Sequence, residues 1–237
     1  IVVGIASWIL AQISLRPLLE ARERERTFIA DAAHELRSPL ATIASVAQAQ
    51  RSDATNDGAR DAFSLISSTA LDASSLIGDL LTLARSPDAT LLSREPVDLA
   101  AVVHTALLEF EPRAAAAQIQ IASEVDSAIV NGDARRLREL IRNLLENAMQ
   151  HARTRILVRC TAGSESALLQ IIDDGMGVDA GDRERIFQRF FHGSNSISGS
   201  GLGLAIAQWV AHAHNGFLTL DETSGGASFT AQIPLLR

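Results

Sequence analysis

The sequence of 237 residues predicts two structural units. The first is an α hairpin forming a dimeric four-helix bundle, and the second is an α/β sandwich domain. Apolar residues recur at alternating steps of three and four over residues 18–50 and again over residues 59–84, a spacing typical of helices that pack along one seam. After a break at residues 85–96, helix-like and strand-like runs alternate to the C-terminus. Helices packed on one face of a largely antiparallel sheet account for that alternation.

Residues 1–17 are predicted to contain the end of a transmembrane helix and a juxtamembrane segment. The run 1–15 is apolar apart from small polar residues and Gln12, and the chain does not begin with methionine, so we expect a fragment. As a helix the run spans about 22 Å, less than the hydrocarbon core of about 30 Å. Arginines follow it at positions 16, 22, 24 and 26. Basic residues after the run indicate its cytoplasmic side, whereas those of a cleaved signal peptide precede the apolar region.

The first hairpin helix, within residues 18–50, has an outward-facing histidine close to a proline. Its seam consists of Ile29, Ala33, Leu36, Leu40, Ile43 and Ala47. His34 lies about 130° around the helix from the centre of that seam. Pro39 costs roughly 3 kcal/mol in a helix interior. Because Pro39 also frees the carbonyl of Glu35, it creates a bend point beside the histidine.

The second hairpin helix is predicted over residues 59–84. Its seam consists of Phe63, Ile66, Ala70, Ala73, Ile77, Leu80 and Ala84. The polar, turn-rich segment Arg51 to Gly58 reverses the chain between the two helices. A single hairpin cannot cover so wide an apolar face, so two copies are expected to pair as a four-helix bundle. Residues 18–86 are therefore predicted to be a dimerisation unit.

Residues 87–96 are predicted to be a linker, and residues 97–237 the sandwich domain. Helical patterns cover residues 99–117, 134–152 and 201–214. Strand-like runs cover residues 119–125, 128–132, 155–160, 167–174, 217–222 and 227–235, and the last two are expected to form a hairpin.

Composition excludes several functions. The net charge of −7 and the lack of a basic patch argue against nucleic-acid binding. Cys160 is the only cysteine, so an internal disulfide and a cysteine-built metal site are excluded, and we expect a buried small hydrophobe. His104 is expected to be structural. His212 and His214 are two residues apart and do not share a helix face as metal ligands would.

Three short motifs in the second unit suggest nucleotide chemistry. Asn143 and Asn147 are four residues apart on one helix face, and amide oxygens suit a magnesium ion that is also held by phosphates and water. DDGMG, Asp173 to Gly177, follows a strand, where a carboxylate can accept a hydrogen bond from an adenine amino group. GSGLGL, Gly199 to Leu204, precedes a helix whose first N–H groups can cradle phosphates. Each motif alone is a weak signal.

In their order and spacing, these motifs make the chain similar to the bacterial two-component sensor histidine kinases, from about Leu18 to the C-terminus. HELRSPL resembles the H box of that family, NLLENA the N box, DDGMG the G1 box, IFQRFF the F box and GSGLGL the G2 box; SGGASFTAQIPL resembles the closing strands. The resemblance implies a dimerisation and phosphotransfer domain of the HisKA type, followed by an ATP-binding sandwich of the GHKL or Bergerat type.

The resemblance implies a role for each catalytic residue of the H box. His34 would take the γ-phosphoryl group of ATP, since an imidazole is neutral and nucleophilic near pH 7. Glu35 would orient the ring or accept its proton during the attack. Ser38 stands where threonine or asparagine commonly positions water to hydrolyse the phosphorylated partner, so a phosphatase activity is also implied.

The resemblance further implies an ATP site with bound Mg²⁺. Asn147 would be the essential magnesium ligand, and Asn143 would support it one turn earlier. Asp173 would bind the adenine amino group, and Arg189 would contact phosphate. The other implied nucleotide-binding positions are His151, Gly175, Gly177, Gly199, Gly201, Leu202, Gly203 and Leu204. Residues 192–198 would form a lid.

The partners implied by the resemblance are a second copy of the chain, through residues 18–86, and the receiver domain of a response regulator. The membrane would be contacted through the N-terminal segment, and no nucleic acid is expected. The expected location is the bacterial cytoplasmic (inner) membrane, with residues from about 16 onward in the cytoplasm.

Two alternatives stay open, and two departures from the family pattern suggest the first of them. Gln150, His151 and Ala152 stand where a basic residue and an aromatic usually follow the N box, and His192 replaces a common arginine. A non-catalytic dimeric scaffold is therefore one alternative. A GHKL ATPase that closes a clamp without modifying a histidine is the other, although the helical HELRSPL segment argues against it.

Overall fold

The structure is a computed structural model that describes residue 36 and residues 39–51, 56–84, 92–193, 201–221 and 225–236. The chain divides into two compact units, Ile1–Ser86 and Pro87–Arg237. The predictions for residues 1–17, His34, Glu35, Ser38 and Gly199 fall outside the described residues. Among the helices that the structure describes, none is both long enough and apolar enough to cross a membrane.

The predicted helical hairpin is confirmed: residues 39–51 are helical and α2 spans Asp57–Ala84. At the start of α2, the side-chain oxygen of Asn56 accepts a hydrogen bond of 2.7 Å from the backbone N–H of Ala59, as a helix cap does. The two helices pack through small side chains. Ala44, Ala47 and Ala70 are at most 7% exposed, and the hydroxyl of Ser67 donates to the carbonyl of Ala44 at 3.5 Å.

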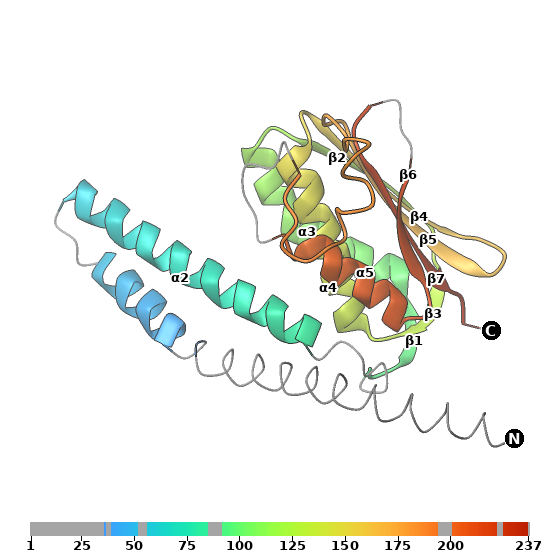
Figure 1. The fold of residues 1–237 in the computed structure, drawn as a ribbon, viewed down its shortest axis with the longest axis horizontal. Coiled ribbons are helices and arrows are strands. Elements are labelled where there is room, and N and C mark those ends of the chain that lie inside the picture. Colours follow the sequence, from blue (N-terminus) through green and yellow to red (C-terminus); the bar gives the residue numbers. More distant parts are fainter. Residues whose placement is uncertain are drawn as a thin grey trace, which may run out of the picture. The chain divides into compact units, whose positions relative to one another are not determined.

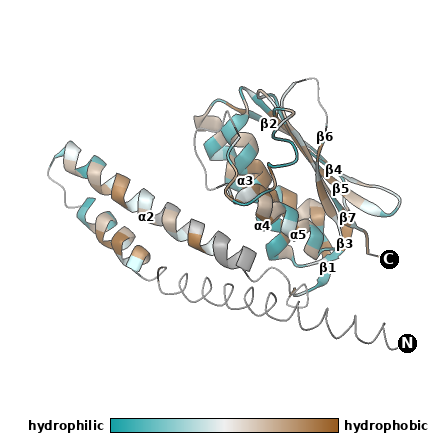
Figure 2. Ribbon diagram, viewed as in Figure 1, coloured by the Kyte–Doolittle hydropathy of each residue, from teal (hydrophilic) through white to brown (hydrophobic). Residues whose placement is uncertain are grey.

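The hairpin leaves large apolar side chains uncovered. Leu36, Ile43, Val46, Leu65 and Ile66 are between 45% and 68% exposed. Figure 2 shows hydrophobic and hydrophilic residues alternating along α2. An apolar face of this kind on a hairpin is what a second copy would cover in a four-helix bundle.

In the second unit, three helices cover one face of a five-stranded sheet (Figure 1). The strand order is β2 (Gln120–Val125), β4 (Arg155–Ala162), β5 (Ser166–Asp173), β7 (Ser228–Pro234) and β6 (Phe217–Asp221). The β2–β4 pair is parallel and the other pairs are antiparallel, as expected for a largely antiparallel sheet. The helices are α3 (Leu99–Ala116), α4 (Ala134–His151) and α5 (Gly203–Ala213).

Strand β1 (Glu95–Asp98) was not predicted. It pairs antiparallel with β3 (Ile129–Gly132), and it begins within the range that the sequence suggests is linker. Four residues that include Pro96 carry too little alternation to indicate a strand, so its pairing is set by tertiary structure.

The core lies between the helices and the sheet. α4 buries one apolar stripe, and its residues Leu137, Leu140, Ile141, Leu144 and Leu145 are at most 1% exposed. Inward residues alternate along β4 and β5, and Cys160 is one of them, fully buried as expected. Burial, with smaller effects from the Asp98 and Asp126 carboxylates, raises the pKa of the Cys160 thiol to about 11. The thiol is therefore a packing group at neutral pH.

The other face of the sheet carries a row of polar side chains across neighbouring strands. Arg159 donates to the carboxylate of Glu124 at 2.7 Å and to the amide oxygen of Gln170 at 3.2 Å. The amide nitrogen of Gln170 donates to the hydroxyl of Thr230 at 3.2 Å. These residues are direct register partners on β2, β4, β5 and β7, so the row stabilises the strand register on a face that water can reach.

A buried histidine ties the end of α5 to the start of α4. His214 is 2% exposed; its Nε2 accepts a 3.0 Å hydrogen bond from the backbone N–H of Asp133, and its Nδ1 donates to the carbonyl of Val210 at 2.8 Å. Asp133 in turn caps α4 through the N–H groups of Arg135 and Arg136. This arrangement requires the neutral ring, because a protonated Nε2 cannot accept a hydrogen bond.

We predict that acid destabilises this unit through His214. Burial is the largest effect and lowers the pKa of His214 below its ordinary value of 6.5; the Val210 hydrogen bond opposes it, the nearby Arg94 guanidinium adds to it, and the Asp133 carboxylate has a small opposing effect. The unfolded chain therefore binds the proton first. The contribution of His214 to stability is complete above about pH 6.5 and is lost as the pH falls toward its folded pKa.

Urea unfolding at a series of pH values between 7.5 and 5 would check this. The free energy of unfolding should fall across that range, and the fall should be smaller in His214→Gln. His104→Gln, which removes an exposed histidine of α3, is the matched control. An equal slope in wild type and His214→Gln would contradict the assignment.

Candidate nucleotide-binding site

One face of α4 carries three of the predicted site residues. Asn143, Asn147 and His151 lie at successive steps of four residues and are all half-buried. Eight residues of helix place the ends of this row about 12 Å apart. The row thus connects the start of α5 with the loop after β5.

The Asn143 end of the row lies against the start of α5. The amide nitrogen of Asn143 donates to the carbonyl of Glu139 at 2.9 Å, so the amide oxygen of Asn143 points away from that carbonyl. A side chain at Gly203 would place its Cβ only 3.0 Å from that oxygen. Leu202 is fully buried at the N-cap of α5, and its side chain makes no capping hydrogen bond. The first N–H groups of α5 are therefore suited to an anion.

Asn147, in the middle of the row, fits a magnesium ion that is shared with phosphates. Its half-buried side chain makes no hydrogen bond with any residue that the structure describes. Among those same residues, no group of three or more His, Cys, Asp or Glu side chains could hold a metal ion. Magnesium commonly takes few protein ligands and completes its coordination with water and phosphate oxygens. The half-buried amide of Asn147 agrees with that mode of binding.

The His151 end of the row meets the loop after β5. A Cβ at Gly175 would collide with the carbonyl of His151, and a Cβ at Gly177 would lie 2.7 Å from the carbonyl of Gly226. Gly177 and Gly226 also have φ values of +75° and +79°. Glycine is needed at these positions because neighbouring backbone segments approach closely. Gly177 and Gly226 also adopt left-handed backbone conformations, which glycine favours.

Asp173 is a buried carboxylate beneath this loop. It is 3% exposed, and its Oδ1 accepts from the N–H groups of Gly175 at 2.9 Å and Ala227 at 3.3 Å. Its Oδ2 makes no hydrogen bond with the described part of the chain. Burial raises the pKa of this carboxyl, against the opposing effects of the two N–H donors and of His151. One oxygen is thus fixed by the backbone, and the other remains available to a ligand donor.

Asp174, its neighbour, has a different role that sequence reasoning missed. Its carboxylate accepts from the N–H groups of Arg153 and Thr154 and from the hydroxyl of Thr154, the last at 2.6 Å. These hydrogen bonds, chiefly that of the Thr154 hydroxyl, hold the pKa of Asp174 well below its ordinary value. Asp174 therefore fixes the connection between α4 and β4. Because its partners are 20 and 21 residues away, no local pattern indicates this role.

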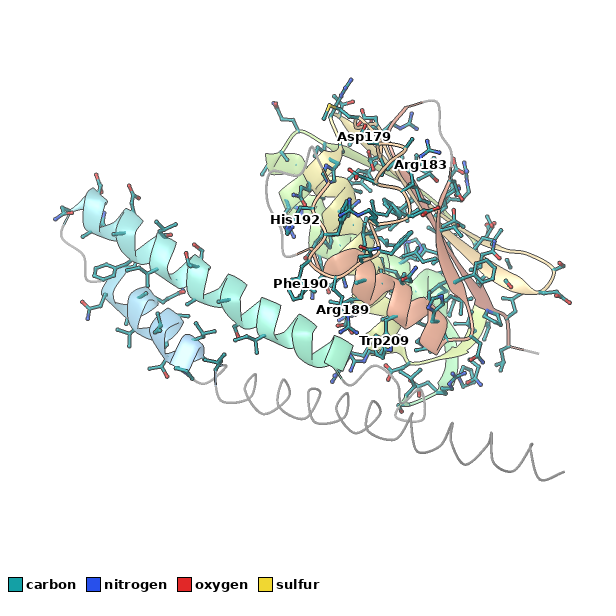
Figure 3. The ribbon with its side chains drawn as sticks, viewed as in Figure 1. Asp179, Arg183, Arg189, Phe190, His192 and Trp209 are labelled. Atoms are coloured by element: carbon teal, nitrogen blue, oxygen red, sulfur yellow. The ribbon has the colours of Figure 1, made fainter. Side chains whose placement is uncertain are left out.

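The segment before α5 is tied to the start of that helix. The N–H of Phe190 donates to the carbonyl of Gly201 at 2.9 Å, and both residues have positive φ, +60° and +66°. The guanidinium of Arg185 lies 4.6 Å from the centre of the Phe191 ring. Arg189 is exposed, and Figure 3 shows its position next to Phe190. The predicted phosphate contact thus belongs to a segment whose end lies beside Gly201.

The structure brings together the predicted positions of α4, the loop after β5 and the start of α5. The predicted lid, residues 192–198, is described only at its first two residues. His192 is exposed there, and its Nδ1 lies 3.1 Å from the carbonyl of Phe190.

Two family models match the chain, and they correspond to its two units. The model for the "His Kinase A (phospho-acceptor) domain" matches residues 24–88. The model for the "Histidine kinase-, DNA gyrase B-, and HSP90-like ATPase" matches residues 132–237. A phospho-acceptor hairpin followed by an ATPase sandwich defines the catalytic core of a histidine kinase. The chain belongs to the sensor histidine kinases.

Known relatives agree with this assignment. The sensor histidine kinase RppB of Synechocystis sp. is 34% identical over 245 residues, which cover 98% of this chain and 54% of RppB. The signal transduction histidine-protein kinase/phosphatase MprB of Mycolicibacterium smegmatis is 34% identical over 90% of this chain and 45% of its own length. The chain thus spans about half the length of the curated relatives it matches.

Solved structures of histidine kinases are also similar to this chain. Full-length ShkA in complex with AMPPNP superposes with a TM-score of 0.76 and 27% identity, covering 88% of this chain and 46% of ShkA. A structure of the mycobacterial sensor histidine kinase MprB has a TM-score of 0.56 and 31% identity, covering 60% of this chain and 98% of that one.

We predict opposite stability effects for the two adjacent carboxylates. At neutral pH, Asp173→Asn should leave the melting temperature unchanged or raise it, because the mutation removes a buried charge while an amide oxygen can still accept from Gly175 and Ala227. Asp174→Asn should lower the melting temperature, because the Asp174 carboxylate is stabilised in the folded state. That stabilisation is lost as the pH falls below about 3.8 toward the folded pKa. Thermal unfolding of both variants at pH 7 would check the contrast, and a larger loss in Asp173→Asn would refute it.

Proposed function

We propose that this protein autophosphorylates His34 from Mg-ATP and transfers the phosphoryl group to an aspartate of a response regulator. The observation that carries the proposal is the order of the two family matches on one chain, a phospho-acceptor domain followed by an ATPase domain. The frame formed by α4, the loop after β5 and the start of α5 supports it. That frame combines a buried carboxylate with an available oxygen, half-buried amides and a helix start without a side-chain cap.

In the proposed site, each element of the frame contacts one part of the nucleotide. Asp173 Oδ2 accepts a hydrogen bond from the adenine amino group, and Gly175 and Gly177 let the base lie close to the backbone. The first N–H groups of α5, from Gly203 onward, bind phosphate oxygens, and the Arg189 guanidinium adds positive charge. A Mg²⁺ ion, held by Asn147 with support from Asn143, would neutralise charge on the phosphates. His151, Gly199, Gly201, Leu202 and Leu204 complete the proposed set.

The proposed chemistry is an in-line transfer to an imidazole nitrogen. A ring nitrogen of His34 forms a bond to the γ-phosphorus as the bond from that phosphorus to the bridging oxygen breaks, and ADP leaves. Glu35 orients the ring or takes its proton, which keeps the nucleophilic nitrogen unprotonated. Pro39 would provide a bend point near this ring, so that the helix can adopt more than one geometry.

A phosphatase activity toward the response regulator is a second proposal for the same hairpin. The relative MprB is named a kinase/phosphatase. Ser38 has a hydroxyl that could position a water molecule for attack on the acyl phosphate of the partner. The balance of the two activities would then depend on the geometry of the hairpin near Pro39.

The proposed setting is a homodimer, formed through residues 18–86, at the bacterial inner membrane. The apolar residues left uncovered on the hairpin support the dimer. The apolar run at residues 1–15, followed by arginines, supports a membrane segment with residues from about 16 onward in the cytoplasm.

We predict that the chain from about Glu20 labels with radioactive ATP and magnesium, and that His34→Gln and Asn147→Asp do not. The label on the wild type should be lost in acid and kept in base, as expected for a phosphoramidate. Nucleotide binding by His34→Gln is the control, because that variant should keep its ATP site. Absence of label on a wild type that binds nucleotide would refute the kinase proposal, favour a scaffold and implicate Gln150 and His192.

Nucleotide recognition has its own test. Asp173→Asn should weaken ATP binding about a hundredfold. Its amide nitrogen would take the place of Oδ2, so that a donor instead of an acceptor would face the adenine amino group. Asp174→Asn should bind ATP as the wild type does. Isothermal titration of both variants would measure the difference, and equal affinities would refute the adenine contact.

A further inference from the structure

The last residues before β1 are fixed to the ends of two helices. The guanidinium of Arg94 donates to the carbonyl of Ala213, the last residue of α5, at 2.6 Å. The backbone N–H of Ser93 donates to the carboxylate of Asp133, the N-cap of α4, at 3.3 Å. We call Ser93, Arg94, Asp133, Ala213 and His214 the linker junction. It joins positions 40 and 119 residues apart in the chain.

The junction is tightly built around His214. That ring accepts from the N–H of Asp133 and donates to the carbonyl of Val210. A Cβ on Gly132, at the end of β3, would lie 2.7 Å from the ring, so no side chain fits there. The chain that enters the domain is thus held against the beginning of the helix carrying Asn143 and Asn147, and against the end of the helix that begins at Gly203.

We propose that Arg94 is a positioning residue for phosphotransfer. By clamping the incoming chain to α5, it makes the end of the linker and the ATP-binding domain move as one body. A change in the direction of the linker then turns the bound ATP toward or away from His34. This inference rests on the proposed kinase function, and it assigns the linker junction no contact with ATP.

The position of the clamp predicts which kinetic constant it affects. Arg94 binds the C-terminal end of α5, which is about 15 Å from Gly203 at 1.5 Å per residue. The site end of the helix pair is held by buried residues such as Leu144 and Ile206, both 0% exposed. Losing the Arg94 contact should therefore leave ATP affinity unchanged. It should instead reduce the fraction of bound ATP that reaches the histidine in line.

The test compares Arg94→Met, Arg94→Lys and Arg135→Met in the full chain. Arg94→Met removes the donor, whereas Arg94→Lys keeps a cation that can donate to the carbonyl of Ala213. Arg135→Met is the matched control, since Arg135 is an exposed arginine on the first turn of α4 that contributes only its backbone N–H to the Asp133 cap. The measurements are the autophosphorylation rate over a range of ATP concentrations and the hydrogen-exchange rate of the Ser93 amide.

Arg94→Met should lower the rate at saturating ATP about tenfold and leave the KM for ATP within about twofold of wild type. The Ser93 amide should exchange faster in that variant, Arg94→Lys should recover most of the rate, and Arg135→Met should match wild type. An unchanged rate in Arg94→Met, a raised KM, or unchanged Ser93 exchange would each overturn the inference while the kinase proposal stands. A wild type that does not label would instead overturn the kinase proposal and this inference with it.

Discussion

The burial of one face of α4 is the constraint on which the candidate site depends. Side chains on a helix are about 100° apart, so the burial of one stripe also fixes the directions of all the other side chains. Leu140, Leu144 and Leu145 are at most 1% exposed. Their burial leaves Asn143, Asn147 and His151 in a half-buried row at the boundary between core and solvent. Groups at such a boundary are ordered by packing, yet a ligand can reach them.

The end of β5 shows how the same residue type acquires two roles. Successive residues of a strand point to opposite faces, so Asp173 points into the core and Asp174 points away from it. The inward carboxylate is held by backbone N–H groups and destabilised by burial; the outward one is stabilised by Arg153 and Thr154. Asp173 thus keeps hydrogen-bonding capacity on its second oxygen, as the proposed contact with adenine requires.

The open face of the sheet and the exposed face of the hairpin differ in how much a second molecule would stabilise them. The open face of the sheet carries a connected row from Glu124 through Arg159 and Gln170 to Thr230, which satisfies its polar groups without a partner. The hairpin instead exposes large apolar side chains, such as Ile43 and Leu65, whose burial would be favourable. The HisKA family match implies dimerisation, and the exposed apolar side chains of the hairpin offer a surface for it.

Sequence alone determined the elements whose signals are local. The three- and four-residue steps specified the hairpin, the amphipathic period specified α4, and short branched runs specified the strands of the main sheet. The order of five short motifs then specified the family. Periodicity and motif spacing can be read without knowing what packs against what.

Tertiary structure decided the features that join residues far apart in the chain. β1 has four residues and exists because β3 lies beside it. The role of Asp174 also depends on the fold, because its partners Arg153 and Thr154 lie 21 and 20 residues away in the chain. The contacts of Arg94 with Ala213, and of His214 with Asp133, cross 119 and 81 residues. No local pattern encodes such pairs, because each depends on a close approach that only the packed helices and sheet create.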